Sequence, residues 1–345
     1  MLTSVKDLLP YLEPVWQRWL GSFAGPWFGT NMVNNGWPYT VPGPGSRVDW
    51  LEDGEPLPGT DLELMRRHLF EGEGVTIAIL NGLCHFSALR GNYEYAAALA
   101  AAYNDWQIDT WLEKEPRLRG SINVVAHDPQ VAREIDRLAG HPQIVQVFLP
   151  TVTDRQYGDP FYWPIFEAAL RHDLPVAFHH ANHTQTVLGY PRTFIEWHTT
   201  AAPQAAQNQI LSLVCNGLFD KHPDLKVVFL EASVGWVPWF MARLDQQYRE
   251  LRTEVPWVKR LPSAHMRDCV RVATQPMSDV KPAEFARLVE ETESERIFLF
   301  STDYPHYDAD SADSILPKTL PSELRARVRW KNAAETYPKL AYLTA

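Results

Sequence analysis

The composition of the 345-residue chain excludes several classes of protein before any motif is considered. The net charge is −10 at pH 7 and no block of Lys or Arg stands out, so nucleic acid and anionic membranes are poor partners. The longest apolar runs are only as long as a strand, so we expect no membrane-spanning segment. Three widely spaced cysteines, Cys84, Cys215 and Cys269, are typical of thiols in a reducing compartment. We therefore expect a cytoplasmic protein.

The first 60 residues differ from the rest of the chain. They are rich in Trp, Pro, Gly and Asn and show no periodicity, which predicts an irregular backbone. Aromatic rings are costly to leave in water, so we expect Trp27, Trp37 and Trp50 to be buried against the rest of the chain or against a second subunit. A loosely attached arm is the alternative. Residues 1–60 are thus predicted to be an irregular, aromatic-rich segment packed on a catalytic domain formed by residues 61–345.

From residue 61 onward, short apolar runs alternate with helical segments. Each run is β-branched or aromatic and lacks polar alternation, which is typical of a strand buried on both faces. Strict alternation of strand and helix predicts a parallel α/β architecture of the (β/α)-barrel kind. The predicted strands are 75–80, 122–125, 144–149, 174–178, 226–230, 270–274 and 296–300.

The predicted helices lie around these strands and after the last one. Their approximate ranges are 61–71, 93–113, 161–172, 204–220, 237–251, 282–293, 322–330 and 332–340, with one more after Pro129. A closed barrel of this kind needs eight strands, and the pattern contains seven. The sequence therefore predicts a (β/α)8 TIM barrel whose first strand is missing or atypical.

Three polar residues stand where the catalytic groups of such barrels lie, just past the carboxyl ends of the strands. His179 and Glu231 end two predicted strands, and Asp303 follows the last one. Imidazole and carboxylate groups that converge on one mouth can bind Zn²⁺ or Mn²⁺, or can share a proton transfer. The alternative is that each side chain only caps a helix or satisfies loop backbone. We predict that the three side chains open into one pocket.

Further histidines are weaker candidates. His180, His183 and His198 lie near one another in a polar stretch, where a solvated loop is the simpler interpretation. One of them could instead orient a metal ligand through a hydrogen bond. His306 is better placed, because it lies one short turn past Asp303. We predict that His180, His183 and His306 support the metal site or contact the substrate.

Five stretches carry a resemblance to a known family through their order and spacing, namely 174–179, 217–226, 229–239, 300–306 and 332–334. Together they resemble the amidohydrolase-related family that includes aminocarboxymuconate-semialdehyde decarboxylase and other nonoxidative decarboxylases. The resemblance runs from about residue 8 to residue 340. It implies a barrel enzyme that depends on a divalent metal, zinc or manganese. It also implies that His179 and Asp303 bind this metal, and that Asp303 handles a proton.

Two departures from the family pattern bear on the reaction. The best-known decarboxylases of the family have an acid–base histidine after the sixth strand, where this chain has Glu231. The first strand of the family carries Asp-x-His-x-His, whose histidines bind the metal, and this motif does not occur in the chain. We expect the motif to be encoded upstream of the Met1 codon, and a metal-free homologue is the alternative. The metal site is then incomplete in this chain.

The resemblance favours a metal-dependent lyase that acts on a small carboxylated aromatic or cyclic substrate. Asp303 and Glu231 would be its catalytic residues. Hydrolysis of an ester, a lactone or a carbon–carbon bond is the alternative reaction. A catalytically dead barrel that serves as a binding or assembly subunit is the alternative from another class. We expect a small-molecule substrate and a homodimer, with neither nucleic acid nor membrane as a partner.

Overall fold

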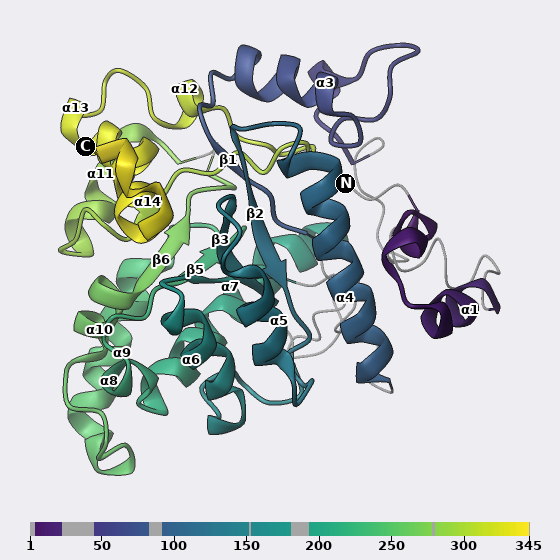
Figure 1. Ribbon diagram of the computed structural model, residues 1–345. Coiled ribbons are helices and arrows are strands. Elements are labelled where there is room, and N and C mark those ends of the chain that lie inside the picture. Colours follow the sequence, from purple (N-terminus) through teal and green to yellow (C-terminus); the bar gives the residue numbers. More distant parts are fainter. Residues whose placement is uncertain are drawn as a thin grey trace.

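A curled sheet of parallel strands forms the centre of the fold (Figure 1). The computed structural model describes residues 4–22, 45–82, 92–151, 153–180, 193–277 and 280–344. Within these ranges, seven strands lie side by side in the order of the chain. They are β1 (Ala78–Ile79), β2 (Leu118–Asn123), β3 (Ile144–Pro150), β4 (Val176–His179), β5 (Val227–Leu230), β6 (Val270–Ala273) and β7 (Phe298–Leu299). The predicted parallel α/β architecture is confirmed, and each of these strands overlaps a predicted one.

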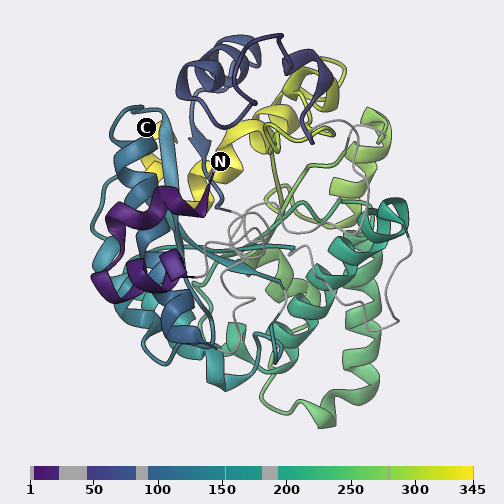
Figure 2. The same ribbon diagram turned by 90° about the vertical axis from the view of Figure 1, so that its right-hand side faces the viewer.

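Helices surround the sheet (Figures 1 and 2). The α-helices are α1 (Pro14–Ser22), α3 (Leu62–Met65), α4 (Tyr93–Gln107), α5 (Val131–Leu138), α6 (Trp163–Arg171), α7 (Phe194–Cys215), α8 (Leu218–Lys221), α9 (Val237–Leu251), α10 (Pro262–Cys269), α11 (Pro282–Glu291), α12 (Ala312–Ile315), α13 (Ser322–Ala326) and α14 (Asn332–Thr336). Short 3-10 or π-helical segments are η1 (Val5–Tyr11), η2 (Val48–Trp50), η3 (Arg66–Gly72), η5 (Ile108–Leu112), η6 (Pro160–Tyr162), η7 (Arg252–Glu254), η8 (Arg327–Lys331) and η9 (Pro338–Thr344).

Helix α7 is longer than the sequence predicted. The expected start near residue 204 follows Pro203, because proline usually marks a helix boundary. The helix instead begins directly after Thr193, whose hydroxyl accepts a hydrogen bond from the Glu196 backbone, while the Glu196 carboxylate accepts one from the Thr193 backbone. Such a capping box satisfies two backbone donors of the first turn. The additional turns carry His198, which the prediction had left in a loop.

Side chains of neighbouring strands alternate between the helix-covered face and the inside of the sheet. Phe178 of β4 and Phe229 of β5 stack with their ring centroids 5.0 Å apart, and Phe166 of α6 packs on Phe178. Burial of each ring stabilises the fold by about 1.5–3 kcal/mol. Because successive strand residues point to opposite faces, His179 and Leu230 point inward. Because Phe178 packs toward the helices, the side chain of the next residue, His179, points into the interior.

A cavity of about 930 Å³ opens in the interior between β1 and β7. Strand β1 pairs with β2 and strand β7 pairs with β6, and no strand of the described ranges joins their outer edges. Ile77, Ile79 and Phe300 line the cavity, together with Tyr337, whose hydroxyl donates to Gln146 Oε1 at 2.8 Å. A closed barrel fills this space with layers of side chains. Among the described residues, a cavity takes the place of these layers along the seam.

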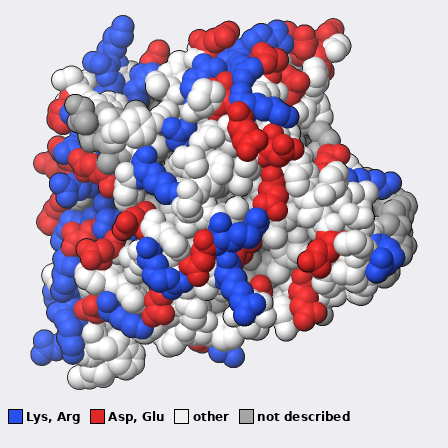
Figure 3. All heavy atoms as spheres, in the orientation of Figure 1, with Lys and Arg blue, Asp and Glu red and all other residues white. Residues whose placement is uncertain are grey.

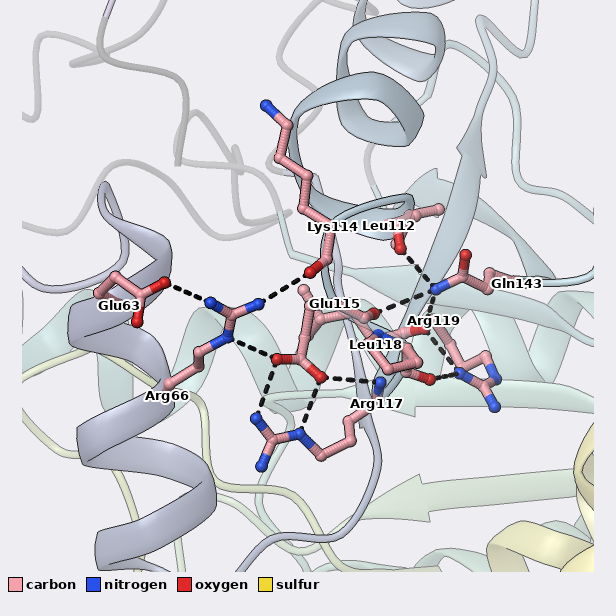
Figure 4. A network of polar contacts seen from close by, with 10 residues as sticks. Glu63, Arg66, Leu112, Lys114, Glu115, Arg117, Leu118, Arg119 and Gln143 are labelled. Atoms are coloured by element: carbon pink, nitrogen blue, oxygen red, sulfur yellow. Dashed lines mark hydrogen bonds and ion pairs between the residues drawn. The ribbon is translucent and has the colours of Figure 1, made fainter.

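A buried carboxylate ties the start of β2 to the helical segment before β1 (Figure 4). Glu115 is 2% exposed, and its two oxygens accept hydrogen bonds from Arg117 Nε at 2.8 Å and Arg66 Nε at 2.7 Å. Arg66 also donates to the Lys114 carbonyl, and Gln143 Nε2 donates to the Glu115 carbonyl. Arg117 and Arg66 lower the pKa of the Glu115 carboxyl to about 2. The pair of guanidinium groups therefore keeps this buried acid ionised.

We expect Glu115→Gln to lower the free energy of unfolding by about 1–3 kcal/mol, because both guanidinium groups lose their charged acceptor. The pKa of Glu115 in the folded chain lies below its ordinary value of 4.5, so its contribution is present above pH 4.5 and is lost as the pH falls toward 2. Urea unfolding at pH 7 and pH 3 measures both effects, with the exposed Glu113→Gln as control. Equal stability of Glu115→Gln and the native chain at pH 7 would contradict the prediction.

None of the described helices combines the length and the apolar character that crossing a bilayer requires. On the face drawn in Figure 3, Lys and Arg side chains are interspersed with Asp and Glu side chains. This face therefore presents no broad field of one sign.

Candidate metal and catalytic site

His179, Glu231 and Asp303 converge at the carboxyl end of the sheet, and the prediction that they share one pocket is confirmed. His179 is the last residue of β4, Glu231 directly follows β5, and Asp303 lies shortly after β7. All three line the interior cavity. Nε2 of His179 lies 2.8 Å from Oε2 of Glu231. Three strand ends that are far apart in the sequence thus meet at one mouth.

Both carboxylates of the site stand on left-handed backbone. The φ angle is 49° at Glu231, 59° at Ser233 and 57° at Asp303. A residue with a side chain costs about 1–3 kcal/mol in this region, and the conformation persists only where the surrounding structure enforces it. Of the five described residues with side chains that have a positive φ angle, these three lie just past the carboxyl ends of strands, whereas Asp173 and Glu293 do not line the cavity. Such clustering is typical of functional sites, where the backbone must turn a side chain in a required direction.

Glu231 lies at the centre of a group of imidazoles. Nε2 of His180 lies 3.0 Å from its Oε1, and Nε2 of His198 lies 3.4 Å from the same oxygen. Glu231 is 8% exposed. Burial acts to raise the pKa of Glu231, but His180, His179 and His198 hold it well below its ordinary value. At neutral pH this buried carboxylate is therefore ionised.

The contacts around Glu231 have the spacing of metal ligands. Oε2 of Glu231 and Nε2 of His180 are buried, and within the described part of the chain their close polar contacts are the two between Glu231 and these histidines. The ligand atoms of His179, His180 and Glu231 lie within 4.8 Å of one another. Bonds of about 2.0–2.2 Å to one cation place adjacent ligand atoms about 3 Å apart at octahedral angles. Because the observed separations are 2.8 and 3.0 Å, these residues fit a divalent cation.

Asp303 is paired with His306, the histidine that follows it by one turn. Nδ1 of His306 lies 2.7 Å from Oδ2 of Asp303. Burial raises the pKa of Asp303, and the charge of Glu231 adds to this effect while His306 opposes it. Burial acts to lower the pKa of His306, but Asp303 raises it to about 10. His306 is therefore protonated at neutral pH and compensates part of the charge of the carboxylates.

The segment before η2 contacts the turn that carries Asp303. Ser46 forms an isolated antiparallel bridge with His306. The backbone N–H of Arg47 donates to the Pro305 carbonyl at 3.1 Å. These backbone contacts connect the N-terminal part of the chain to the site.

Trp50 packs against the same turn. It is 5% exposed, and its ring centroid lies 4.8 Å from that of Tyr304 and 5.8 Å from that of His68. The predicted burial of Trp50 is confirmed. Trp27 and Trp37 lie outside the described residues.

Two residues of the site were not selected from the sequence. Nε2 of His198 lies 3.4 Å from Oδ2 of Asp308 and also faces Glu231. His198 was rated weakly because it was taken as one of several histidines in a polar, solvated loop. The available signal for Asp308 was its place five residues after Asp303, in the same polar turn. His183, which was predicted to support the site, lies outside the described residues.

In parallel α/β enzymes of the barrel kind, the active site lies at the carboxyl ends of the strands, where this sheet gathers its imidazoles and carboxylates. The model of the amidohydrolase family matches residues 16–339. The chain belongs to the amidohydrolase family.

Relatives of known activity share most of this chain. Gamma-resorcylate decarboxylase of Polaromonas sp. is 25% identical over 301 residues, which cover 84% of this chain and 90% of the relative. The crystal structure of 5-carboxyvanillate decarboxylase from Sphingomonas paucimobilis has 22% identity and a TM-score of 0.64, and covers 81% of this chain and 83% of its own. The structure of a dihydroxybenzoic acid decarboxylase of Polaromonas sp., solved with manganese and 2-nitroresorcinol, has 22% identity and a TM-score of 0.64. The match covers 81% of this chain and 86% of that decarboxylase. Both structures share the fold of this chain.

Proposed function

We propose that the protein is a metal-dependent lyase that removes carbon dioxide, without oxidation, from a small carboxylated aromatic or cyclic acid. The observation that carries the proposal is the convergence of His179, Glu231 and Asp303 at the mouth of one cavity, with both acids on strained backbone. The names of the relatives, which are decarboxylases of resorcylate, carboxyvanillate and dihydroxybenzoate, support this substrate class. A binding subunit without activity would have no need to keep these groups together.

His179 and Asp303 would hold a divalent cation, zinc or manganese, with Glu231 beside them. A bound cation supplies charge stabilisation to substrate oxygens and orients them. His180, which contacts Glu231, and His306, which contacts Asp303, would orient those two acids. His183 is proposed for the same supporting role on its sequence position alone. The apolar walls of the cavity would exclude water from the ring of the substrate.

Asp303 is the residue that we propose delivers the proton. Burial raises the pKa of Asp303 above its ordinary value, which eases the uptake of the proton that this residue then delivers. The proton passes from Asp303 to the ring carbon that carries the carboxylate. The bond from that carbon to the carboxylate then breaks, its electron pair restores the ring, and carbon dioxide leaves. Glu231 assists as a second acid–base group or as a substrate contact.

Removal of the metal tests this function. We expect the metal-loaded chain to release ¹³CO₂ from carboxyl-labelled 2,6-dihydroxybenzoate or 5-carboxyvanillate. Dialysis against a chelator should abolish this release, and Mn²⁺ or Zn²⁺ should restore it. Mass spectrometry of the headspace measures the gas, and heat-denatured protein serves as the blank. Full activity in chelator would contradict the metal, whereas hydrolysis of esters or lactones without gas release would favour the alternative reaction.

We further propose that residues 1–60 brace the catalytic barrel formed by residues 61–345. The bridge between Ser46 and His306 and the hydrogen bond from Arg47 to Pro305 support this division of roles. Both contacts bear directly on the turn that follows Asp303. The N-terminal segment would therefore hold one wall of the active site in place.

We also propose that the protein acts as a homodimer in the cytoplasm. Trp239 of α9 is 62% exposed and Trp257 is 50% exposed, and association would remove such rings from water. Cys215 and Cys269 are free thiols, which suits a reducing compartment. Sedimentation equilibrium measures the mass of the native chain in solution.

A further inference from the structure

One amide side chain in the cavity wall keeps an unused hydrogen-bond acceptor. Gln275 lies two residues past the end of β6, lines the cavity and is 1% exposed. Within the described ranges, its Oε1 is buried and has no hydrogen-bond partner. The other described amides of the cavity wall each have an oxygen that accepts a hydrogen bond, namely Asn81, Gln107 and Gln146. Gln275 therefore differs from them in what its oxygen still has to offer.

The orientation of the Gln275 amide is set by a backbone carbonyl. Its Nε2 donates to the carbonyl oxygen of Asp308 at 3.4 Å. A carbonyl oxygen can only accept, so the nitrogen of the amide must face it and the oxygen must face the other way. A buried acceptor without a donor destabilises the folded chain, and amides with a purely structural role usually use both ends. A bound molecule with a donor would remove this cost.

Hydrogen bonds between the ends of β6 and β7 hold the backbone of Gln275 in place. The N–H of Ser301 donates to Thr274 Oγ1 at 3.2 Å, and the N–H of Gln275 donates to Ser301 Oγ at 3.2 Å. Thr274 is fully buried, and its own N–H donates to the Leu299 carbonyl at 2.8 Å. Because these contacts exist before any ligand binds, little ordering is left to be done on binding.

The position of Gln275 in the sheet places it beside the acids of the site. Strand β6 lies between β5, which ends just before Glu231, and β7, which shortly precedes Asp303. The last apolar residues of these three strands line the cavity and offer a surface to an aromatic ring, namely Leu230, Ala273 and Leu299. A polar substituent on such a ring would lie near the strand ends, where Gln275 stands.

We propose that Oε1 of Gln275 accepts a hydrogen bond from a hydroxyl group on the ring of the substrate, which makes Gln275 a specificity-determining residue. The substrate is then a hydroxylated aromatic acid. An acid that lacks this hydroxyl leaves the buried oxygen unpaired, and sites built to bond a hydroxyl reject such analogues for that reason. The inference rests on the proposed function, which supplies the carboxylated ring.

Paired substrates test the role of Gln275. The metal-loaded full chain and its Gln275→Met variant are each given 2,3-, 2,4- and 2,6-dihydroxybenzoate, and 2-hydroxybenzoate as the acid that lacks the second hydroxyl. For at least one dihydroxybenzoate, we expect the preference over 2-hydroxybenzoate in kcat/KM to be about 10- to 100-fold greater in the native chain than in the variant. Comparison of the two preferences cancels the intrinsic reactivity of the acids. Isothermal titration of the same acids gives the corresponding ratios of Kd without turnover.

Gln209→Met is the matched control. Gln209 is buried too, but its Oε1 accepts from the N–H of Tyr157 at 2.9 Å and its Nε2 donates to the Thr151 carbonyl at 2.7 Å. This variant should melt at a lower temperature than the native chain and keep the native preference among the acids. Gln275→Met should melt no lower than the native chain, because it removes an unsatisfied acceptor from the interior.

An unchanged preference for every dihydroxybenzoate in Gln275→Met, by kcat/KM and by Kd, would overturn the inference. Gln275→Leu also lacks the acceptor and takes the place of Gln275→Met if that variant does not fold. A native chain that binds none of these acids would overturn the inference as well. A native chain that binds them but releases no carbon dioxide refutes the proposed function alone, because the ratios of Kd still decide the role of Gln275.

Discussion

Asp303→Asn is expected to reduce turnover by about 10²–10⁴-fold while the fold remains intact. The amide has the size of the carboxyl group but cannot deliver a proton at neutral pH. It also removes the charge that raises the pKa of His306 to about 10, so that imidazole should titrate nearer its ordinary value. Steady-state kinetics measure the loss, and NMR titration of the His306 ring measures the change in its pKa.

Asp313→Asn is the control for this prediction, because its side chain is 92% exposed and lies outside the site. It should leave kcat, KM and the titration of His306 unchanged. An Asp303→Asn protein with near-native kcat would remove Asp303 from the mechanism. A lower kcat with an unchanged pKa of His306 would mean that the pair at 2.7 Å does not persist in solution.

Glu231→Gln is expected to impair both turnover and metal binding. The change removes the negative charge around which His179, His180 and His198 are gathered. Glutamine keeps one oxygen, but its amide nitrogen cannot serve as a metal ligand. We expect a loss of about 10²–10⁴-fold in kcat, since an acid–base group typically contributes that factor. We also expect the bound metal per chain to fall, which emission spectrometry measures.

Glu167→Gln is the matched control for Glu231. Glu167 also contacts a histidine, with Nε2 of His222 at 3.5 Å, but at a half-exposed position away from the cavity. It should retain full activity and metal. Near-native kcat and metal content in Glu231→Gln would show that Glu231 only supports the loop after β5.

The strands and the three main site residues were predictable because they depend on local patterns. A strand buried on both faces is mostly apolar, and the polar residues that follow it mark its carboxyl end. His179, Glu231 and Asp303 each follow such a run. The carboxyl ends of parallel strands share one side of the barrel, so the architecture predicts that these three side chains lie close together. The cluster of Ser46, Arg47 and Trp50 against the Asp303 turn had no comparable local pattern.

The apolar runs of the chain were enough to predict the parallel strands, their order and the strand ends that carry the site. The rest of the site could not be predicted in this way, because its contacts join segments that no local periodicity relates. The capping box at Thr193 starts α7 early enough to carry His198 to Glu231. The left-handed backbone at Glu231 directs its carboxylate toward His179, His180 and His198. Asp308 lies in the turn after β7 and contacts His198. Each depends on a backbone conformation that the surrounding packing enforces, so residue types alone did not reveal it.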